Sequence, residues 1–141
     1  MASPFVSEEL FPIVVKWAEV ETKTGVKGTL IIRDKETEDR YKGSMNELQT
    51  QWAMPNWKES SNLLAKAYQP DAQTGELRFM WAAYRSLVLD SFMKSWDAKD
   101  DQGNGVPCTP TNIAKLDPAI AAALVEAFLA KTSVSEQELG E

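Results

Sequence analysis

The amino-acid sequence predicts an α+β protein that is predominantly α, with an N-terminal β-hairpin packed on a helical domain. Three observations predict this class: an apolar-rich segment over residues 76–96, two β-branched runs near the N-terminus, and two proline-based helix starts near the C-terminus. The length of 141 residues fits one domain. We place this domain at residues 11–132, with the hairpin at 12–33 and the helical part at 44–132.

The N-terminal part predicts two antiparallel strands. Residues 1–10 are expected to be a flexible lead-in. Pro12–Glu21 and Gly28–Arg33 are rich in β-branched residues, and the turn-forming cluster Thr22–Gly25 separates them. A lone hairpin is marginally stable in water, so we expect it to pack on the helices.

The middle of the chain predicts helices and loops. Asp34–Arg40 is a run of mixed charge and is typical of a solvated connector. Helical material is expected between Ser44 and Ala67, with a break at Met54–Asn56 because proline ends or kinks a helix. Gln69–Gly75 has the composition of a loop.

Residues 76–96 predict a long central helix. Apolar residues recur there at steps of three and four, namely Leu77, Met80, Trp81, Tyr84, Leu87 and Val88. Further apolar residues on both sides of this stripe favour a helix that is buried over most of its circumference. Such a helix would be about 30 Å long, close to the diameter of a small domain.

The C-terminal part predicts a capped helix at residues 118–131. Thr109-Pro110 and Asp117-Pro118 each combine an N-cap residue with proline at the first helical position. Ile120, Leu124 and Phe128 follow at helical spacing. Residues 133–141 are expected to be a disordered acidic tail.

Composition restricts the possible functions. The net charge is −6, and no segment concentrates lysine and arginine, which argues against nucleic acid as a partner. The chain has no histidine and one cysteine, Cys108, so it lacks the residues for a Cys/His zinc site or a nucleophile–histidine pair. We expect no cofactor, no metal, no membrane partner and a cytosolic location.

The acidic turn after Asp97 does not match a calcium-binding loop. In the EF-hand pattern glycine stands at position six and glutamate at position twelve. Counted from Asp97, these positions hold Gln102 and Cys108; counted from Asp100, they hold Gly105 and Thr111. Neither register completes a site, and the sequence favours a solvated turn.

Tryptophans and the last helix are the candidate contact residues, since aromatic side chains are enriched in protein–protein interfaces. The candidates are Trp52, Trp57, Trp96, Leu124 and Phe128. Core packing is the favoured alternative for the last helix, because apolar helix faces are usually buried.

The C-terminal half resembles a known family. It runs through Trp96-Asp97, Asp100-Asp101 with Gly103, Val106-Pro107, Thr109-Pro110, Asn112-Ile113 and Leu116-Asp117-Pro118, and then the small-residue helix 119–128. This order is similar to that of the tail assembly chaperones of long-tailed bacteriophages, and Phe11–Lys16 resembles their opening strand. The resemblance covers about Val88–Lys131 plus the hairpin, and Cys108 stands where family members commonly carry an aromatic residue.

The resemblance implies a non-enzymatic protein of the host cytoplasm that self-associates. Its implied partners are the tape-measure protein and the tail-tube protein, which it brings together during tail assembly. Two alternatives stay open. One is a small phage structural adaptor, such as a head–tail completion or minor tail protein, and the other is a hydrolase that uses metal-bound water and needs converging carboxylates.

Overall fold

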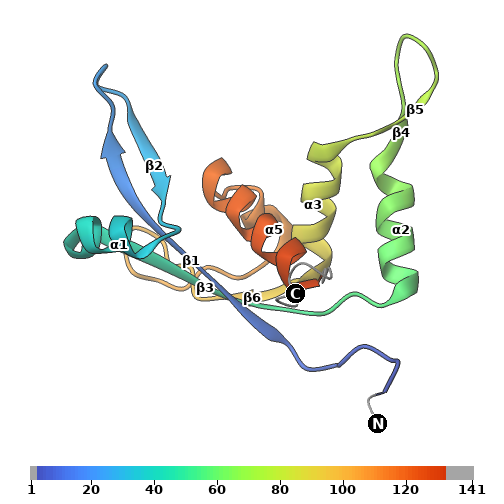
Figure 1. The fold of residues 1–141 in the computed structure, drawn as a ribbon, viewed down its shortest axis with the longest axis horizontal. Helices are drawn as coiled ribbons and strands as arrows, with labels where there is room; N and C mark the ends of the chain where they lie inside the picture. Colours follow the sequence, from blue (N-terminus) through green and yellow to red (C-terminus); the bar gives the residue numbers. More distant parts are fainter. Residues whose placement is uncertain (1–2, 133–141) are drawn as a thin grey trace, which may run out of the picture.

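The computed structural model describes residues 3–132, and the expected tail at 133–141 lies outside them. Helices take up 40% and strands 28% of these residues, so the prediction of a predominantly helical protein is wrong. The fold is a four-stranded antiparallel sheet with helices, plus a small two-stranded sheet (Figure 1). The elements are β1 (Phe11–Glu21), β2 (Lys27–Ile31), α1 (Lys35–Tyr41), η1 (Lys42–Ser44), β3 (Met45–Trp52), α2 (Trp57–Ala67), β4 (Tyr68–Pro70), β5 (Leu77–Phe79), α3 (Trp81–Phe92), β6 (Met93–Trp96), α4 (Pro110–Ile113) and α5 (Pro118–Thr132).

The predicted N-terminal hairpin is confirmed. β1 and β2 pair in antiparallel register from Trp17↔Ile31 to Glu21↔Lys27. The turn is closed by the Thr22 N–H, which donates to the Val26 carbonyl at 2.8 Å. Gly25 has φ of 82° in this turn, a conformation that glycine adopts without steric cost.

The third strand was missed by the sequence analysis, which expected helical material from Ser44. β3 pairs with β1 from Phe11↔Trp52 to Ala18↔Met45, so the sheet order is β2-β1-β3-β6. Leu48, Thr50 and Trp52 alternate as its buried residues. A threonine among them weakens the apolar alternation that would reveal a strand, and the pairing with β1 joins residues far apart in the chain. The break at Met54–Asn56 is confirmed, since α2 begins after it.

The long central helix over residues 76–96 is also wrong. Its segment divides into β5, α3 and β6, and only the middle part is helical. Met80 is extended, with φ of −99° and ψ of 99°, and the helix ends where the Met93 N–H donates to the Leu89 carbonyl. The chain then continues as β6, with Thr50 of β3 opposite Trp96. Pairing with β3 satisfies the backbone there, which local periodicity cannot predict.

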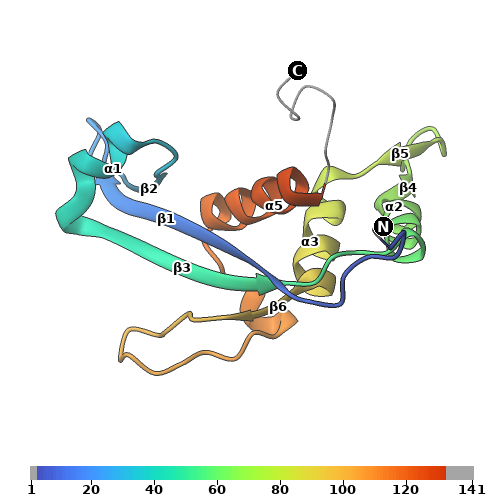
Figure 2. The same cartoon turned by 60° about the horizontal axis from the view of Figure 1, so that its bottom comes forward.

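The core lies between the sheet and helices α3 and α5. Phe128 of α5 lies at its centre, with ring centroids 5.0 Å from Trp52, 5.5 Å from Phe92 and 6.1 Å from Phe11. In two views α5 lies on the same side of β1 as β2 does (Figures 1 and 2). The helix therefore lies beside the part of β1 that has no pairing with β2. Covering an unpaired strand edge with a helix is one way in which proteins protect that edge.

The predicted start of the last helix is confirmed. The Asp117 carboxylate accepts the Ala119 N–H at 2.8 Å, and Thr109 caps α4 by accepting the Asn112 N–H at 3.4 Å. Two polar contacts tie α5 to the β2 region: Thr29 donates to Asp117 at 2.9 Å, and Arg33 pairs with Glu126 at 2.9 Å.

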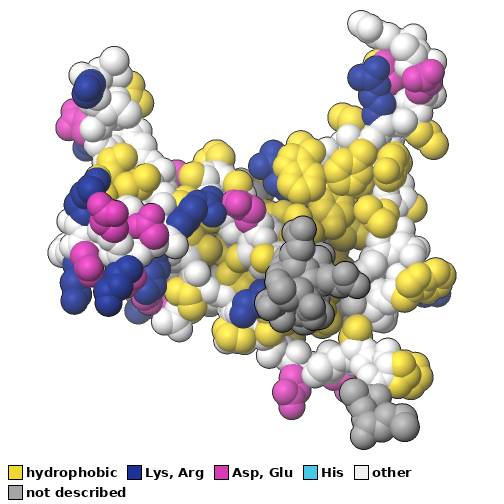
Figure 3. All heavy atoms as spheres, viewed as in Figure 1, with side chains coloured by type: hydrophobic (Ala, Val, Ile, Leu, Met, Phe, Trp, Pro, Cys, Tyr) yellow, Lys and Arg dark blue, Asp and Glu magenta, His cyan; other side chains and the backbone are white. Residues whose placement is uncertain are grey.

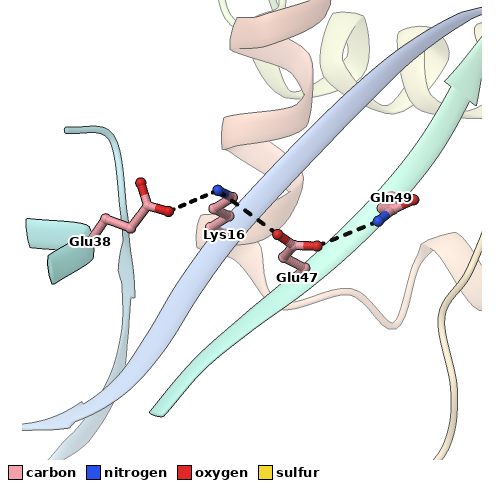
Figure 4. Close-up of polar contacts among 4 residues, drawn as sticks. All are labelled: Lys16, Glu38, Glu47 and Gln49. Carbon is pink, nitrogen blue, oxygen red and sulfur yellow. Dashed lines mark hydrogen bonds and ion pairs between the residues drawn. The ribbon is translucent and has the colours of Figure 1, made fainter. Parts of the chain in front are cut away.

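An ion-pair cluster joins α1 to the sheet (Figure 4). The Lys16 ammonium of β1 lies 3.0 Å from Glu38 of α1 and 3.8 Å from Glu47 of β3, and Gln49 donates to Glu47 at 3.4 Å. The hydrogen bond to Glu38, with the attraction of that carboxylate, raises the pKa of Lys16. These side chains are about one-third exposed or more, so the cluster positions α1 and contributes little stability.

Candidate protein-binding surface

Three of the five predicted contact residues lie inside the protein. Trp52 and Leu124 are fully buried, and Phe128 is 2% exposed. The Trp52 indole N–H donates to the Thr50 hydroxyl at 2.6 Å, and that hydroxyl donates to the Ile13 carbonyl at 2.8 Å. The structure therefore brings Trp52 and Phe128 together as core residues, and none of the three offers a surface to a partner.

The other two predicted residues differ from each other. Trp96 is partly buried, and its indole N–H donates to the Val106 carbonyl at 2.6 Å. Trp57 is 84% exposed at the first turn of α2. Asn56 caps that helix in a reciprocal capping box with Glu59, which fixes where Trp57 stands. Trp57 alone among the five is free to contact another molecule through most of its surface.

A hairpin arm forms between α2 and α3 from the segment that the sequence identified as a loop. β4 and β5 pair from Tyr68↔Phe79 to Pro70↔Leu77. Asp71 organises the tip, because its carboxylate accepts the N–H groups of Gln73 at 2.7 Å and Thr74 at 3.1 Å. The arm projects from the rest of the molecule at the upper right of Figure 1.

Aromatic side chains gather at the base of this arm and the start of α3. Ring centroids form a continuous series: Tyr68 to Phe79 at 5.5 Å, Phe79 to Trp81 at 5.9 Å, and Trp81 to Tyr84 at 5.5 Å. With two neighbouring apolar side chains they form a surface that we call the aromatic patch, consisting of Tyr68, Leu77, Phe79, Met80, Trp81 and Tyr84.

The aromatic patch is open to solvent. Leu77 is 70% exposed, Tyr68 49%, Trp81 47%, Met80 42% and Phe79 38%. Figure 3 shows hydrophobic side chains gathered over the upper part of α3 and the base of the arm, with basic side chains at the border. Tyr84 is the most enclosed member, and burial raises the pKa of its phenol. Contiguous exposed apolar surface of this kind marks interaction sites on soluble proteins.

A narrow cleft between α3 and α5 adjoins the patch. Its volume is about 250 Å³, and small side chains line most of it: Ala82, Ser86, Ala121 and Ala122, with Leu89, Pro118 and Arg85. The Arg85 guanidinium lies over the Trp81 ring, 5.7 Å from the centroid. Arg85 therefore stands where the cleft meets the aromatic patch.

A second, larger cleft lies at the other end of the core. Its volume is 480 Å³, and it lies among Trp17, Leu48, Ala98, Leu116 and Ile120, with Asn46, Glu47, Asp97 and Lys99 at the polar positions. The Asp97 carboxylate accepts the Gln49 N–H at 2.8 Å. This backbone hydrogen bond engages the Asp97 carboxylate. Glu47 and Asp97 therefore do not form a pair of free carboxylates in the cleft.

The acidic turn and Cys108 are the remaining places where the sequence could carry a metal site or a reactive group. Asp100 accepts the N–H groups of Gln102 and Asn104, each at 2.9 Å, so its carboxylate holds the turn itself. Burial raises the pKa of the Cys108 thiol. Within residues 3–132, no group of three or more acidic, histidine or cysteine side chains is placed to hold a metal ion. In the same part of the chain, no helix is long and apolar enough to cross a membrane.

Sequence reasoning missed the aromatic patch because it assigned Leu77, Met80, Trp81 and Tyr84 to a buried helix. A signal was present: Tyr68 and Phe79 flank a loop rich in turn-forming residues, which is the pattern of a hairpin. Comparisons with protein-family models, with curated proteins and with solved structures found no match for this chain.

Proposed function

We propose that this chain is a non-enzymatic tail assembly chaperone of a long-tailed bacteriophage, which acts in the host cytoplasm as an oligomer. It binds the tape-measure protein and recruits tail-tube subunits during tail assembly. The observation that carries the proposal is the aromatic patch, an exposed apolar surface on a chain of net charge −6. The resemblance of the C-terminal half to these chaperones supports the identity of the partners.

The patch has the properties that a holding protein needs. Full burial of a large apolar side chain contributes about 1.5–3 kcal/mol, so each half-exposed member of the patch contributes about half of that when a partner covers it. The net negative charge keeps the free protein soluble while this surface is uncovered. Charge and patch together suit a protein that covers the apolar surface of another.

The structural adaptor remains the second candidate, and the projecting β4–β5 arm favours it. An adaptor retained in the particle needs an ordered arm for contacts with its neighbours. The tip of this arm is ordered by Asp71, which also pairs with Arg78 at 3.1 Å. An adaptor would be recovered from purified particles, whereas a chaperone would be absent from them.

Co-expression tests the proposed function. The tape-measure protein from the same gene neighbourhood is expressed alone, with this chain, and with its Trp81→Ala variant. We expect the tape-measure protein to be soluble and to co-purify only with the unaltered chain. Phe5→Ala is the control, since it removes an aromatic side chain that is 83% exposed and lies outside both the patch and the predicted contact residues. An insoluble tape-measure protein in every case, with this chain present in purified particles, would replace the chaperone with the adaptor.

A further inference from the structure

Arg85 makes no ion pair among residues 3–132. Its guanidinium lies over the Trp81 ring, and no side-chain hydrogen bond or ion pair links it to any other described residue. Arg78 of β5 differs, because it forms an ion pair with Asp71 at 3.1 Å. Arg85 is also partly buried, at the junction between the aromatic patch and the α3–α5 cleft. A guanidinium has five N–H donors in a planar fork that matches a carboxylate.

The cleft beside Arg85 is lined mostly by small side chains, which suits the close approach of a helix. Ala82, Ser86, Ala121 and Ala122 are small, so the backbone of another segment can approach α3 and α5 closely. Leu89, Ser86 and Ala121 also line an adjoining cleft of 200 Å³ next to α4, which continues the same line along α3. From Trp81 to the end of α3 this line extends for about 17 Å, which is the length of three turns of a partner helix.

We propose that the aromatic patch and the α3–α5 cleft form one docking track for the apolar face of a partner α-helix, with a carboxylate of that helix bound by Arg85. The inference deepens the proposed function and rests on it for the source of the partner. Trp81 and Arg85 are of the residue types that dominate binding energy at interfaces, and here they are in contact. The track binds its partner as a helix in a groove.

Charge sets where along the track a carboxylate of the partner is favoured. Asp90, further along α3, lines the adjoining cleft, where partial burial raises the pKa of its carboxyl. An acidic residue of the partner is favoured beside Arg85 and disfavoured beside Asp90. The carboxylate of the bound helix therefore lies at the end of the track nearest the β4–β5 arm.

Two synthetic peptides test the docking track without the phage partner. Both are amphipathic helices with the same leucine and alanine face; one carries glutamates beside that face and the other carries lysines. The chain has a net charge of −6, so general electrostatic attraction favours the lysine peptide. At physiological ionic strength, screening limits such attraction to about 8 Å, and local contacts decide the preference. We expect the glutamate peptide to bind at least ten-fold more tightly.

Variants locate the preference. Arg85→Glu should remove or reverse it, and Arg85→Lys should weaken glutamate-peptide binding because lysine lacks the planar fork. Phe5→Ala is the control, at an exposed aromatic residue outside the track, and should bind both peptides as the unaltered chain does. Circular dichroism confirms that each variant is folded. Amide and methyl NMR shifts on adding the glutamate peptide should fall on Trp81, Ala82 and Ala122.

Three results would overturn the inference. They are equal or tighter binding of the lysine peptide, NMR shifts confined to surfaces away from α3 and α5, and a dimer in sedimentation that Trp81→Ala dissociates, since a second copy would then occupy the track. Failure of the docking track can be distinguished from failure of the proposed function. A tape-measure complex that forms with both Trp81→Ala and Arg85→Glu would refute the docking track but leave the chaperone proposal standing.

Discussion

Replacing Trp52 by alanine should destabilise the whole protein rather than weaken a surface contact. The side chain is fully buried against Phe128, and its indole N–H supplies the donor to the buried Thr50 hydroxyl. Truncation of a buried tryptophan costs about 3–5 kcal/mol, against a total stability of about 5–15 kcal/mol for typical domains. An unfolding entropy of about 2.1 cal/mol/K per residue converts this cost to a fall in Tm of about 10–17 °C for a chain of this length.

Trp57→Ala provides the matched control, because the same atoms are removed from a side chain that is 84% exposed. Its effect should stay within about 0.5 kcal/mol. Trp52→Phe keeps an aromatic ring in the core but removes the pyrrole part of the indole together with the donor to the Thr50 hydroxyl, so its cost should lie between those of Trp57→Ala and Trp52→Ala. Thermal and urea unfolding followed by far-UV circular dichroism measure all three. Equal Tm values for Trp52→Ala and Trp57→Ala would refute the placement of Trp52 in the core.

Four further predictions concern local structure. Asn56→Ala removes the capping box of α2 and should cost about 1 kcal/mol in urea unfolding; no loss would mean that the cap is not formed. Gly75→Ala forces alanine to a φ of 74° and should cost about 1–2 kcal/mol, whereas Gly43→Ala, at a site without positive φ, should not destabilise. Iodoacetamide should alkylate Cys108 more slowly in the folded protein than in urea. Because burial raises the pKa of this thiol, the alkylation rate of the folded protein should rise only at a pH above the pKa of an ordinary thiol. Equal rates in the two states would contradict this. The Thr37 N–H lowers the pKa of Asp34, so the cap of α1 is stabilising above the unfolded pKa and is lost as the pH falls through the folded pKa; an NMR titration of this carboxyl at or above the ordinary aspartate range would contradict that sign.

The sequence predicted the elements whose signals are local. The β1–β2 hairpin has β-branched runs around a glycine turn, and α5 begins at Asp117-Pro118 with an apolar face at helical spacing. Each signal depends on neighbouring residues only. Both elements were therefore found, with bounds that differ from the observed ones by a few residues.

The elements that were mispredicted depend on distant pairing. β3 carries polar residues at exposed positions and Thr50 at a buried one, and it is stabilised by pairing with residues of β1 that lie 27 to 41 positions earlier. β6 continues directly from α3 and becomes a strand because β3 is beside it. A run of apolar residues from Leu77 to Trp96 satisfies helical spacing whether or not the backbone is helical throughout, so periodicity alone could not divide it.

The candidate site was found only in part. Trp57 was expected at a surface and lies there, but Trp52, Leu124 and Phe128 are core residues. Aromatic side chains have the same sequence signature whether they fill a core or form an interface, because both environments favour large apolar groups. Exposure decides between them, and exposure depends on the complete fold.

The most direct test is the recovery of soluble tape-measure protein on co-expression with this chain and with its Trp81→Ala and Phe5→Ala variants. We predict a soluble complex with the unaltered chain and with Phe5→Ala, and loss of that complex with Trp81→Ala. A tape-measure protein that stays insoluble with the unaltered chain would contradict the proposed function. A soluble complex that all three chains form equally would contradict the role of the aromatic patch.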